Sequence, residues 1–275
     1  MSATTMEESN RLRSVLAKGQ GPSFGLWNMI PDDNVARMLA RVPNIDWVLI
    51  DCEHGNIDDR SMHHAIPAVA STGVSPIVRI PGTESWMIKR ALDAGAHGIL
   101  VPLLRTAAEA REIVQAAKFP PQGIRGFGSA LPMERFQSQP TMSEYLQQAN
   151  NALLTMVQIE TQQALDNLEE IAAVDGIDLL FVGPFDLGNN IGYPIIDGNF
   201  KPELKDAITR VRDAAHKAGK KCGIYSASSE QANEYAKAGF DMVHVSTDFT
   251  FLQAGMMQQV NIAKGLKAKP TARGY

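Results

Sequence analysis

Residues 76–102 read PIVRIPGTESWMIKRALDAGAHGILVP and contain one complete strand–helix–strand unit. The apolar run at 76–80 predicts a strand, and residues 85–94 repeat their apolar side chains at helical spacing. Gly95 follows where the end of a helix favours glycine, and a second apolar run at 98–102 predicts the next strand. The unit therefore predicts two parallel strands joined by a helix.

The same alternation recurs along the whole chain. Strands are expected at residues 24–28, 47–51, 76–80, 98–102, 153–159, 178–182, 222–226 and 242–246. Amphipathic segments predict helices at residues 34–41, 60–72, 85–94, 107–117, 164–174, 202–218 and 230–238. A doubly wound open sheet shows the same alternation, but it would carry a glycine-rich phosphate turn after an early strand, and no G-x-G-x-x-G follows one here. We therefore expect an α/β protein with a single-domain (β/α)8 TIM barrel.

The chain length is consistent with this fold, because 275 residues are close to the ~250 that one such barrel needs. We assign residues 1–22 to an N-terminal extension, 23–265 to the barrel and 266–275 to a C-terminal tail. Residues 119–150 interrupt the strand–helix rhythm with a Gly/Pro-rich loop and a short helical piece. Long loops in compact domains are usually functional, so we expect this one to cover the C-terminal mouth of the barrel.

Charge and composition exclude several classes of protein. A net charge of −4 argues against nucleic-acid binding, which needs a surplus of clustered Lys and Arg. The first 21 residues contain no apolar stretch of the length that a signal peptide or membrane span requires, so we expect a cytoplasmic protein that does not bind membranes. Cys52 and Cys222 lie in or beside apolar runs and are expected to be reduced thiols.

Polar side chains gather at the expected carboxyl ends of strands, where barrel enzymes place their active sites. These residues are Asp51, Glu53, His54, Arg79, Glu160 and Asp186. Glu160 and Asp186 offer hard oxygen ligands and leave open positions on an octahedral cation, so we expect Mg²⁺ or Mn²⁺, with Co²⁺ as a further candidate. Zinc is not favoured, since the chain has no H-E-x-x-H motif or spaced Cys/His ligand set. The alternative is that both carboxylates are surface caps.

His54 beside Asp51 is a candidate general base, oriented by the neighbouring carboxylate. Arg79 is a candidate for binding a developing negative charge, or alternatively forms a core salt bridge. Further candidates for contact with the substrate are Gln158, Gly183, Pro184, Trp27 and Ser129, and two additional acidic candidates are Glu53 and Asp93. Trp27 could equally pack between barrel and helices, and the loop with Ser129 could be a hinge. The remaining histidines are expected to be structural, and no lysine lies at an expected carboxyl end of a strand for Schiff-base chemistry.

Five motifs occur in order along the chain: WVLIDCEH (47–54), VRIP (78–81), PQGIRG (121–126), VQIET (157–161) and VGPFDL (182–187). Together they resemble the HpcH/HpaI aldolase family of 2-keto-3-deoxy sugar-acid and 4-hydroxy-2-oxoheptanedioate aldolases, which is related to macrophomate synthase and the β subunit of citrate lyase. The likeness covers about residues 24–265. It implies a (β/α)8 barrel and a class II aldolase that uses pyruvate.

The resemblance also implies roles for individual residues. In the family, the residues matching Glu160 and Asp186 bind the metal, and the histidine matching His54 works with the aspartate matching Asp51 in proton transfer. The arginine matching Arg79 holds the keto acid and stabilises its enolate. Family members are commonly homohexamers, built as trimers of dimers, with the last helix exchanged between subunits.

The expected reaction is therefore the reversible aldol cleavage of a 4-hydroxy-2-oxo acid to pyruvate and an aldehyde by a metal-dependent carbon–carbon lyase. Oxaloacetate decarboxylation and macrophomate-synthase-like bond formation are alternatives that use the same enolate, and a non-catalytic metabolite-binding barrel is a more remote one. The chain departs from the family at Phe185, where a smaller residue is frequent, at Cys52, where glycine is frequent, and over residues 131–136. These changes affect the pocket rim and the aldehyde specificity more than the metal ligands.

Overall fold

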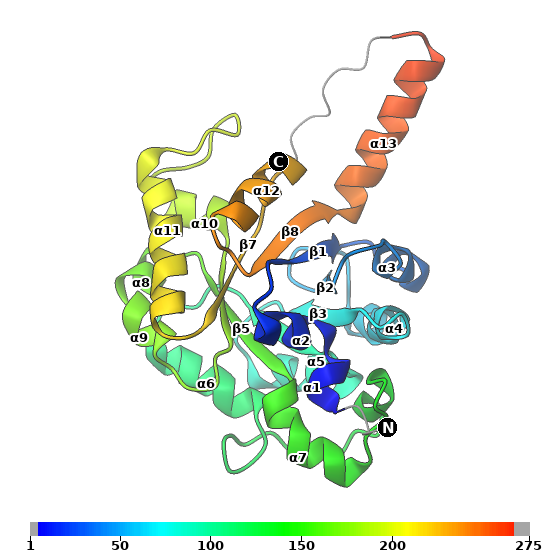
Figure 1. Cartoon of the computed structure of the whole chain (residues 1–275), viewed down its shortest axis with the longest axis vertical. Coiled ribbons are helices and arrows are strands. Elements are labelled where there is room, and N and C mark those ends of the chain that lie inside the picture. The colour runs from blue at the N-terminus through cyan, green and yellow to red at the C-terminus, as the bar shows by residue number, and fades with distance from the viewer. Residues whose placement is uncertain (1–4, 267–275) are drawn as a thin grey trace.

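The computed structural model describes residues 5–266, and its centre is a closed barrel of parallel strands in the order β1 to β8 (Figure 1). The strands are β1 (Ser23–Asn28), β2 (Trp47–Asp51), β3 (Ser75–Arg79), β4 (Gly98–Val101), β5 (Leu154–Ile159), β6 (Leu179–Val182), β7 (Lys221–Ile224) and β8 (Met242–Thr247). Each expected strand overlaps an observed one, with small differences at the ends. The expected (β/α)8 fold is confirmed.

Helices cover the outside of the barrel. They are α1 (Met6–Ser9), α2 (Arg11–Lys18), α3 (Asp33–Ala40), α4 (Asp59–Ala70), α5 (Ser85–Ala94), α6 (Ala107–Ala117), α7 (Met142–Ala152), α8 (Gln162–Asp166), α9 (Leu168–Ala172), α10 (Pro184–Asn190), α11 (Pro202–Lys217), α12 (Ser229–Lys237) and α13 (Asp248–Ala263), with a 3-10 turn η1 (Pro132–Arg135). Thr106 and Thr141 begin α6 and α7 with capping boxes, in which each threonine and a glutamate three residues later bond to each other's backbone N–H. The helix expected at 164–174 is divided into α8 and α9 at Asn167.

Alternate residues of each strand point into the barrel, and this period brings polar groups to its carboxyl end. Trp47 and Leu49 of β2 are fully buried among the interior side chains. Because every second residue of a strand faces the same side, Asp51 lies on that interior face as well. Ile77 of β3 is interior as well, and Arg79 follows it at the same spacing. An apolar layer thus fills the barrel below a polar layer at the ends of the strands.

The two N-terminal helices close the opposite, amino end of the barrel. Leu12 and Leu16 of α2 pack within the interior cluster, where they are nearly inaccessible to solvent. Asn10, between α1 and α2, is fully buried and donates through Nδ2 to the backbone carbonyl of His97 at 2.8 Å. Residues 6–18 therefore contribute directly to the core.

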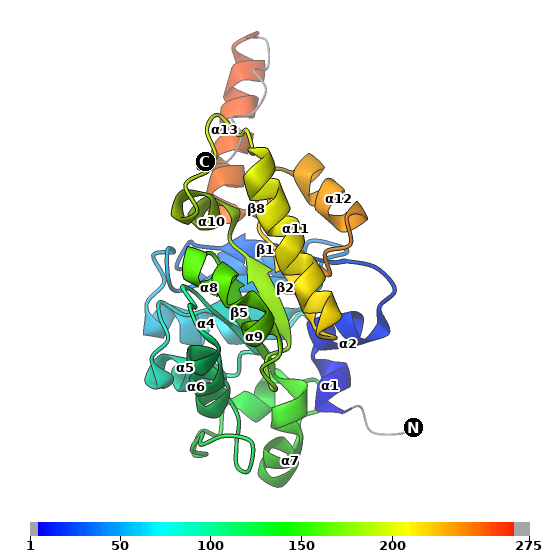
Figure 2. The same ribbon diagram turned by 90° about the vertical axis from the view of Figure 1, so that its left-hand side faces the viewer.

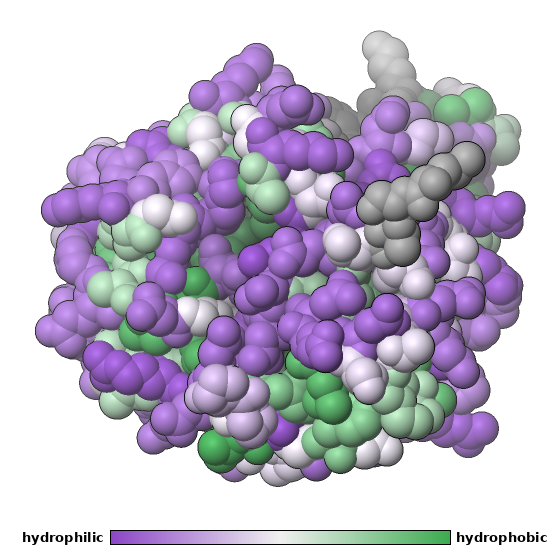
Figure 3. Space-filling model, turned by 60° about the horizontal axis from the view of Figure 1, so that its bottom comes forward, coloured by the Kyte–Doolittle hydropathy of each residue, from purple (hydrophilic) through white to green (hydrophobic). Residues whose placement is uncertain are grey.

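Residues 119–150 lie at this amino end, and the expectation that they cover the C-terminal mouth was wrong. Phe136 stacks on His97, just before β4, with ring centroids 4.2 Å apart, and Ser138 donates its backbone N–H to Ser9 Oγ at 3.0 Å. The reason is that α6 follows β4 and returns the chain to the amino end before this segment starts. Figure 3, which brings the bottom of the molecule forward, shows a mostly polar surface with apolar patches.

Helix α13 projects from the carboxyl end of the barrel, well away from the other helices (Figures 1 and 2). Its exposed apolar side chains are Phe251, Leu252, Met256, Met257, Val260 and Ile262. Within residues 5–266, no helix is both long and apolar enough to span a membrane. Apart from Leu266, the expected C-terminal tail lies outside the described residues.

Candidate active site

A cavity of about 420 Å³ opens at the carboxyl ends of the strands, within the usual size range of small-molecule sites. It is lined by Trp27, Met29, Asp51, His54, Arg79, Gln158, Phe181, Gly183, Pro184, Phe185, Asp186, Tyr225 and Thr247. Most of the candidates from the sequence are among these residues. The strand-end pattern therefore brings them to one place.

Arg79 is held on the cavity wall by Asp51 and Trp27. Its Nε and Nη2 donate to the two carboxylate oxygens of Asp51 at 3.0 and 2.5 Å, and its guanidinium carbon lies 4.9 Å from the centre of the Trp27 ring. Trp27 Nε1 donates to the same carboxylate at 2.8 Å. Burial alone would raise the pKa of Asp51, but the hydrogen bonds and charge of Arg79, together with Trp27, hold that pKa below its ordinary value. Asp51 is thus a buried anion that fixes the guanidinium.

The ring of His54 lies toward Glu53, and the expected pairing of this ring with Asp51 was wrong. His54 is largely exposed, and its Nε2 is 3.8 Å from Glu53 Oε2. The Asp51 carboxylate is already occupied by Arg79, by Trp27 and by the backbone N–H groups of residues 53 and 54. Glu53 also lies 3.1 Å from Nε of Arg79. It therefore connects the guanidinium to the imidazole.

Glu160 is a buried carboxylate at the end of β5. Its Oε1 accepts the backbone N–H of Leu103 at 2.7 Å, and its Oε2 accepts from Nε2 of Gln158. Burial, together with the charges of Glu53 and Asp186, raises the pKa of Glu160 to about 7 against the hydrogen bond from Leu103. Three carboxyl groups that repel each other are an arrangement that a bound cation relieves.

The donor atoms here fit a hard divalent cation. Within residues 5–266, no three His, Cys, Asp or Glu side chains are close enough to hold an ion by themselves. However, Gln158 Oε1 is buried and has no hydrogen-bond partner among the described residues, so it adds a neutral oxygen to the carboxylates of Glu160 and Asp186. Gly183 leaves the space open, since a Cβ there would lie 2.5 Å from Glu160 Oε2. Such a set leaves positions for water and substrate on an octahedral ion.

The structure does not bring two of the candidates, Ser129 and Asp93, to the cavity of this chain. Ser129 Oγ donates to the backbone carbonyl of Asp93 at 2.9 Å, and the Asp93 carboxylate pairs with Arg125 at 2.8 Å. Arg125 also lies over the ring of Phe119, 4.6 Å from its centre. Asp93 lies near the end of α5 and Ser129 in the segment after α6, so both belong to the amino end of the barrel.

Several residues of the site were missed from the sequence. Leu103 adopts a left-handed backbone conformation with φ 55°, which is unusual for a residue with a side chain, and it donates to Glu160. Met29, Tyr225 and Thr247 line the cavity without having been proposed. Each lies at or directly after the end of a strand, so applying the strand-end criterion to apolar and aromatic residues as well as charged ones would have found them.

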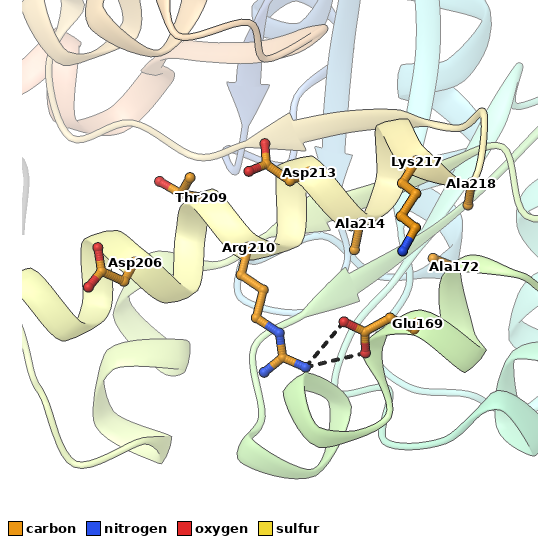
Figure 4. Close-up of a pocket in the computed structure, with 9 residues that line it drawn as sticks. All are labelled: Glu169, Ala172, Asp206, Thr209, Arg210, Asp213, Ala214, Lys217 and Ala218. Atoms are coloured by element: carbon orange, nitrogen blue, oxygen red, sulfur yellow. Dashed lines mark hydrogen bonds and ion pairs between the residues drawn. The ribbon is translucent and has the colours of Figure 1, made fainter.

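A larger hollow of about 610 Å³ lies on the outer helical layer, between α9 and α11 (Figure 4). Arg210 and Glu169 form an ion pair at 3.3 Å in this hollow, and Ala172, Ala214 and Ala218 form part of its lining. No strand end contributes to it among the described residues. We therefore assign the chemistry to the cavity inside the barrel mouth.

Comparison with known proteins agrees with this geometry. Residues 24–254 match the family model described as HpcH/HpaI aldolase/citrate lyase. The chain belongs to this family. A hydroxypyruvate/pyruvate aldolase from Deinococcus radiodurans is 40% identical to it, over 89% of this chain and 86% of the relative. The resemblance inferred from the five motifs is confirmed.

Solved structures of the HpcH/HpaI family superpose closely on this chain. A family protein from Burkholderia cenocepacia J2315 aligns with a TM-score of 0.84 and 33% identity, covering 93% of this chain and 99% of its own. Macrophomate synthase aligns with a TM-score of 0.80 and 27% identity, covering 95% of this chain and 91% of its own. At the coarse level, the protein is accordingly an aldolase-type lyase that acts on small molecules.

Proposed function

We propose that this family member is a class II pyruvate aldolase, which depends on a divalent metal and reversibly cleaves a 4-hydroxy-2-oxo acid to pyruvate and an aldehyde. One observation carries the proposal: Asp186 and Gln158 line the same cavity as the fixed guanidinium of Arg79, and the carboxylate of Glu160 accepts a hydrogen bond from Gln158. The names of the aldolase relatives support the same reaction class.

Glu160 and Asp186 would hold the ion, Mg²⁺ or Mn²⁺ with Co²⁺ as a further candidate, and Gln158 Oε1 adjoins them. When bound, the ion supplies a Lewis acid for the 2-keto oxygen of the substrate. Arg79 binds the keto acid and stabilises the negative charge of the enolate as the C3–C4 bond breaks. Because Asp51 and Trp27 already fix the guanidinium, this stabilisation requires little rearrangement.

His54 is the proposed base. It accepts the proton of the 4-hydroxyl group through a water molecule during cleavage and returns it during addition of pyruvate to an aldehyde. Glu53 Oε2 lies 3.8 Å from Nε2 of this ring. We expect His54→Ala to lower turnover by more than it lowers metal affinity, since a general base contributes roughly 10²–10⁴-fold. Equal losses in both quantities would assign His54 to metal binding.

The decisive test replaces Glu160. Glu160→Ala should reduce two activities by more than about 100-fold, because even residues that only support a metal ligand cost 10–100-fold. These activities are metal-dependent aldol cleavage and the exchange of pyruvate methyl protons with deuterated water, followed by NMR. Glu170→Ala removes an exposed carboxylate from α9 and serves as the matched control. Exchange that persists in chelator-treated protein would contradict the metal assignment.

A second candidate function uses the same enolate differently. Similarity to macrophomate synthase favours decarboxylation of oxaloacetate, or formation of carbon–carbon bonds from the resulting enolate. Product analysis with oxaloacetate separates these reactions from aldol cleavage. A non-catalytic barrel would bind pyruvate without exchanging its methyl protons, so the exchange experiment tests that alternative too.

We further propose a cytoplasmic homohexamer, a trimer of dimers in which neighbouring subunits exchange α13. The projecting helix and its exposed apolar side chains support this assembly, because a large apolar surface is costly to leave in water. Light scattering should give a hexamer mass for the wild type. The double variant Phe251→Glu with Met256→Glu should give smaller species, while Gln258→Glu on the same helix should not. A monomeric wild type would contradict the proposal.

A further inference from the structure

Polar and apolar residues both line the cavity. The polar residues include Asp51, Arg79, Gln158 and Asp186, and the apolar and aromatic residues include Trp27, Met29, Phe181, Phe185 and Tyr225. In the proposed function, Arg79 and the oxygen donors hold the keto acid. The second substrate, an aldehyde, then contacts the apolar and aromatic side chains.

Three aromatic residues, Trp27, Phe185 and Tyr225, form what we call the aromatic wall. The ring centres of Phe185 and Tyr225 are 6.1 Å apart at an interplanar angle of 73°, and those of Trp27 and Tyr225 are 5.6 Å apart at 84°. Such edge-to-face contacts stabilise aromatic clusters. The wall therefore presents a continuous apolar surface, gathered from β1, α10 and the end of β7.

A buried histidine supports this wall from behind. His244 stacks on Tyr225 with ring centres 4.2 Å apart and an interplanar angle of 10°. Its Nδ1 lies 2.9 Å from the carbonyl oxygen of Ser226, and its Nε2 lies 3.2 Å from Thr247 Oγ1. Because the His244 ring is fixed on both sides, Tyr225 has little freedom to move away from a ligand.

The charges in the cavity disfavour an anionic aldehyde. Among the lining residues that the structure describes, Arg79 is the single lysine or arginine, and its Nε and Nη2 already hold Asp51. An aldehyde with its own carboxylate would add a negative charge beside the keto acid, and the described lining offers it no second lysine or arginine. A polyhydroxylated aldehyde would place hydroxyl groups against Trp27 and Phe185, and burying unpaired hydroxyls is unfavourable.

We propose that the acceptor is an uncharged aldehyde with an aromatic or branched aliphatic body, and that the aromatic wall selects it. This inference rests on the proposed function. In the synthetic direction, C3 of pyruvate loses a proton and bonds to the aldehyde carbon, and the aldehyde oxygen takes up a proton to become the C4 hydroxyl. No atom is lost and no oxidant or reductant is needed. The product is a 4-hydroxy-2-oxo acid with an apolar substituent on C4.

The test compares aldehydes of matched shape with pyruvate and Mn²⁺. The pairs are 2-methylbutanal with glyceraldehyde and 4-methylpentanal with succinic semialdehyde, and benzaldehyde is added as the aromatic member. We expect kcat/KM, corrected for aldehyde hydration, to be at least about tenfold higher for the apolar member of each pair, the scale on which pockets discriminate by burial of polar groups. An equal or higher kcat/KM for glyceraldehyde or succinic semialdehyde would overturn the inference.

A variant tests whether the wall itself sets this preference. Phe185→Arg supplies the missing cation and should shift the kcat/KM ratio at least about tenfold toward succinic semialdehyde. Trp86→Arg, a substitution of an exposed aromatic residue at the start of α5, is the matched control and should leave the ratio unchanged. If both variants shift the ratio alike, the preference arises from net charge, and the assignment to the wall fails.

The wild-type exchange experiment separates the two proposals. Exchange of pyruvate methyl protons without turnover of the apolar aldehydes would overturn the acceptor inference while leaving enolate formation intact. Loss of both would overturn the proposed function, and the inference would fall with it.

Discussion

His97 and His244 are fully buried histidines that act at opposite ends of the barrel. His97 lies 2.8 Å from the carbonyl oxygen of Arg135 and stacks on Phe136, while His244 supports Tyr225. Burial lowers the pKa of each ring to about 4. Both rings are therefore neutral in the folded protein near pH 7.

These lowered pKa values make folding sensitive to acid. Between about pH 6.5 and pH 4, the unfolded chain binds protons at these rings and the folded chain does not. The free energy of unfolding therefore decreases as the pH is lowered through this range. We expect His97 to contribute about 2 kcal/mol to this loss between pH 7.5 and pH 5. In urea titrations, the free energy of unfolding of the wild type should be lower at pH 5 than at pH 7.5. His97→Gln should make this difference smaller by that amount. His64→Gln, at an exposed position of α4, should reduce it much less. An unchanged difference in the His97 variant would contradict the assignment.

At the scale of elements, Asp248 joins the start of α13 to the end of β1. Its Oδ2 accepts from Asn28 Nδ2 at 2.9 Å and from the backbone N–H groups of Met29 and Ile30 at 2.9 and 3.0 Å. Its Oδ1 accepts the N–H of Phe249 at 2.7 Å. Met29 lines the cavity, so this buried carboxylate fixes one edge of the site to the base of the projecting helix.

Asp248→Ala should lower the free energy of unfolding by about 3 kcal/mol, because it leaves several partly buried donors without an acceptor. Asp58→Ala also removes a carboxylate that accepts a backbone N–H, that of Ser61 at 2.8 Å, but at an exposed helix start. This control should cost clearly less. Chemical denaturation measures both values, and equal losses would show that Asp248 is only a helix cap.

The sequence predicted the elements well where one local signal determined them. Short runs of apolar residues placed every strand, and the strand-end criterion located Asp51, Arg79, Glu160 and Asp186. The prediction failed for residues 119–150, which were expected at the carboxyl end of the barrel because they come after β4. The helix α6 lies between β4 and this segment and returns the chain to the amino end. Side-chain partners such as Glu53 for the His54 ring depend on competing donors in three dimensions, and no spacing in the chain encodes them.

At the scale of the whole molecule, the amino end of the barrel must be covered to keep its apolar interior from water. The helices α1 and α2 cover it. The sequence assigned residues 1–22 to an extension because α1 and α2 are too short to give a clear periodic pattern. Leu12 and Leu16 of α2 nevertheless complete the interior cluster that supports the polar layer above it. The stability of the active site thus depends on residues at the far end of the barrel.

Leu12 gives this dependence a quantitative test. It is fully buried at the amino end of the barrel, where it packs in the same cluster as Trp47 and Leu49 below Asp51. Leu12→Ala should lower the free energy of unfolding by about 2–5 kcal/mol, the usual cost of a cavity in a packed core. Val15→Ala, at a half-buried position on the same helix, removes less buried surface and slightly raises the helix propensity, so it should cost clearly less. If urea denaturation gives the same small loss for both variants, α2 lies on the barrel without stabilising it, and the interior beneath the catalytic layer is stable on its own.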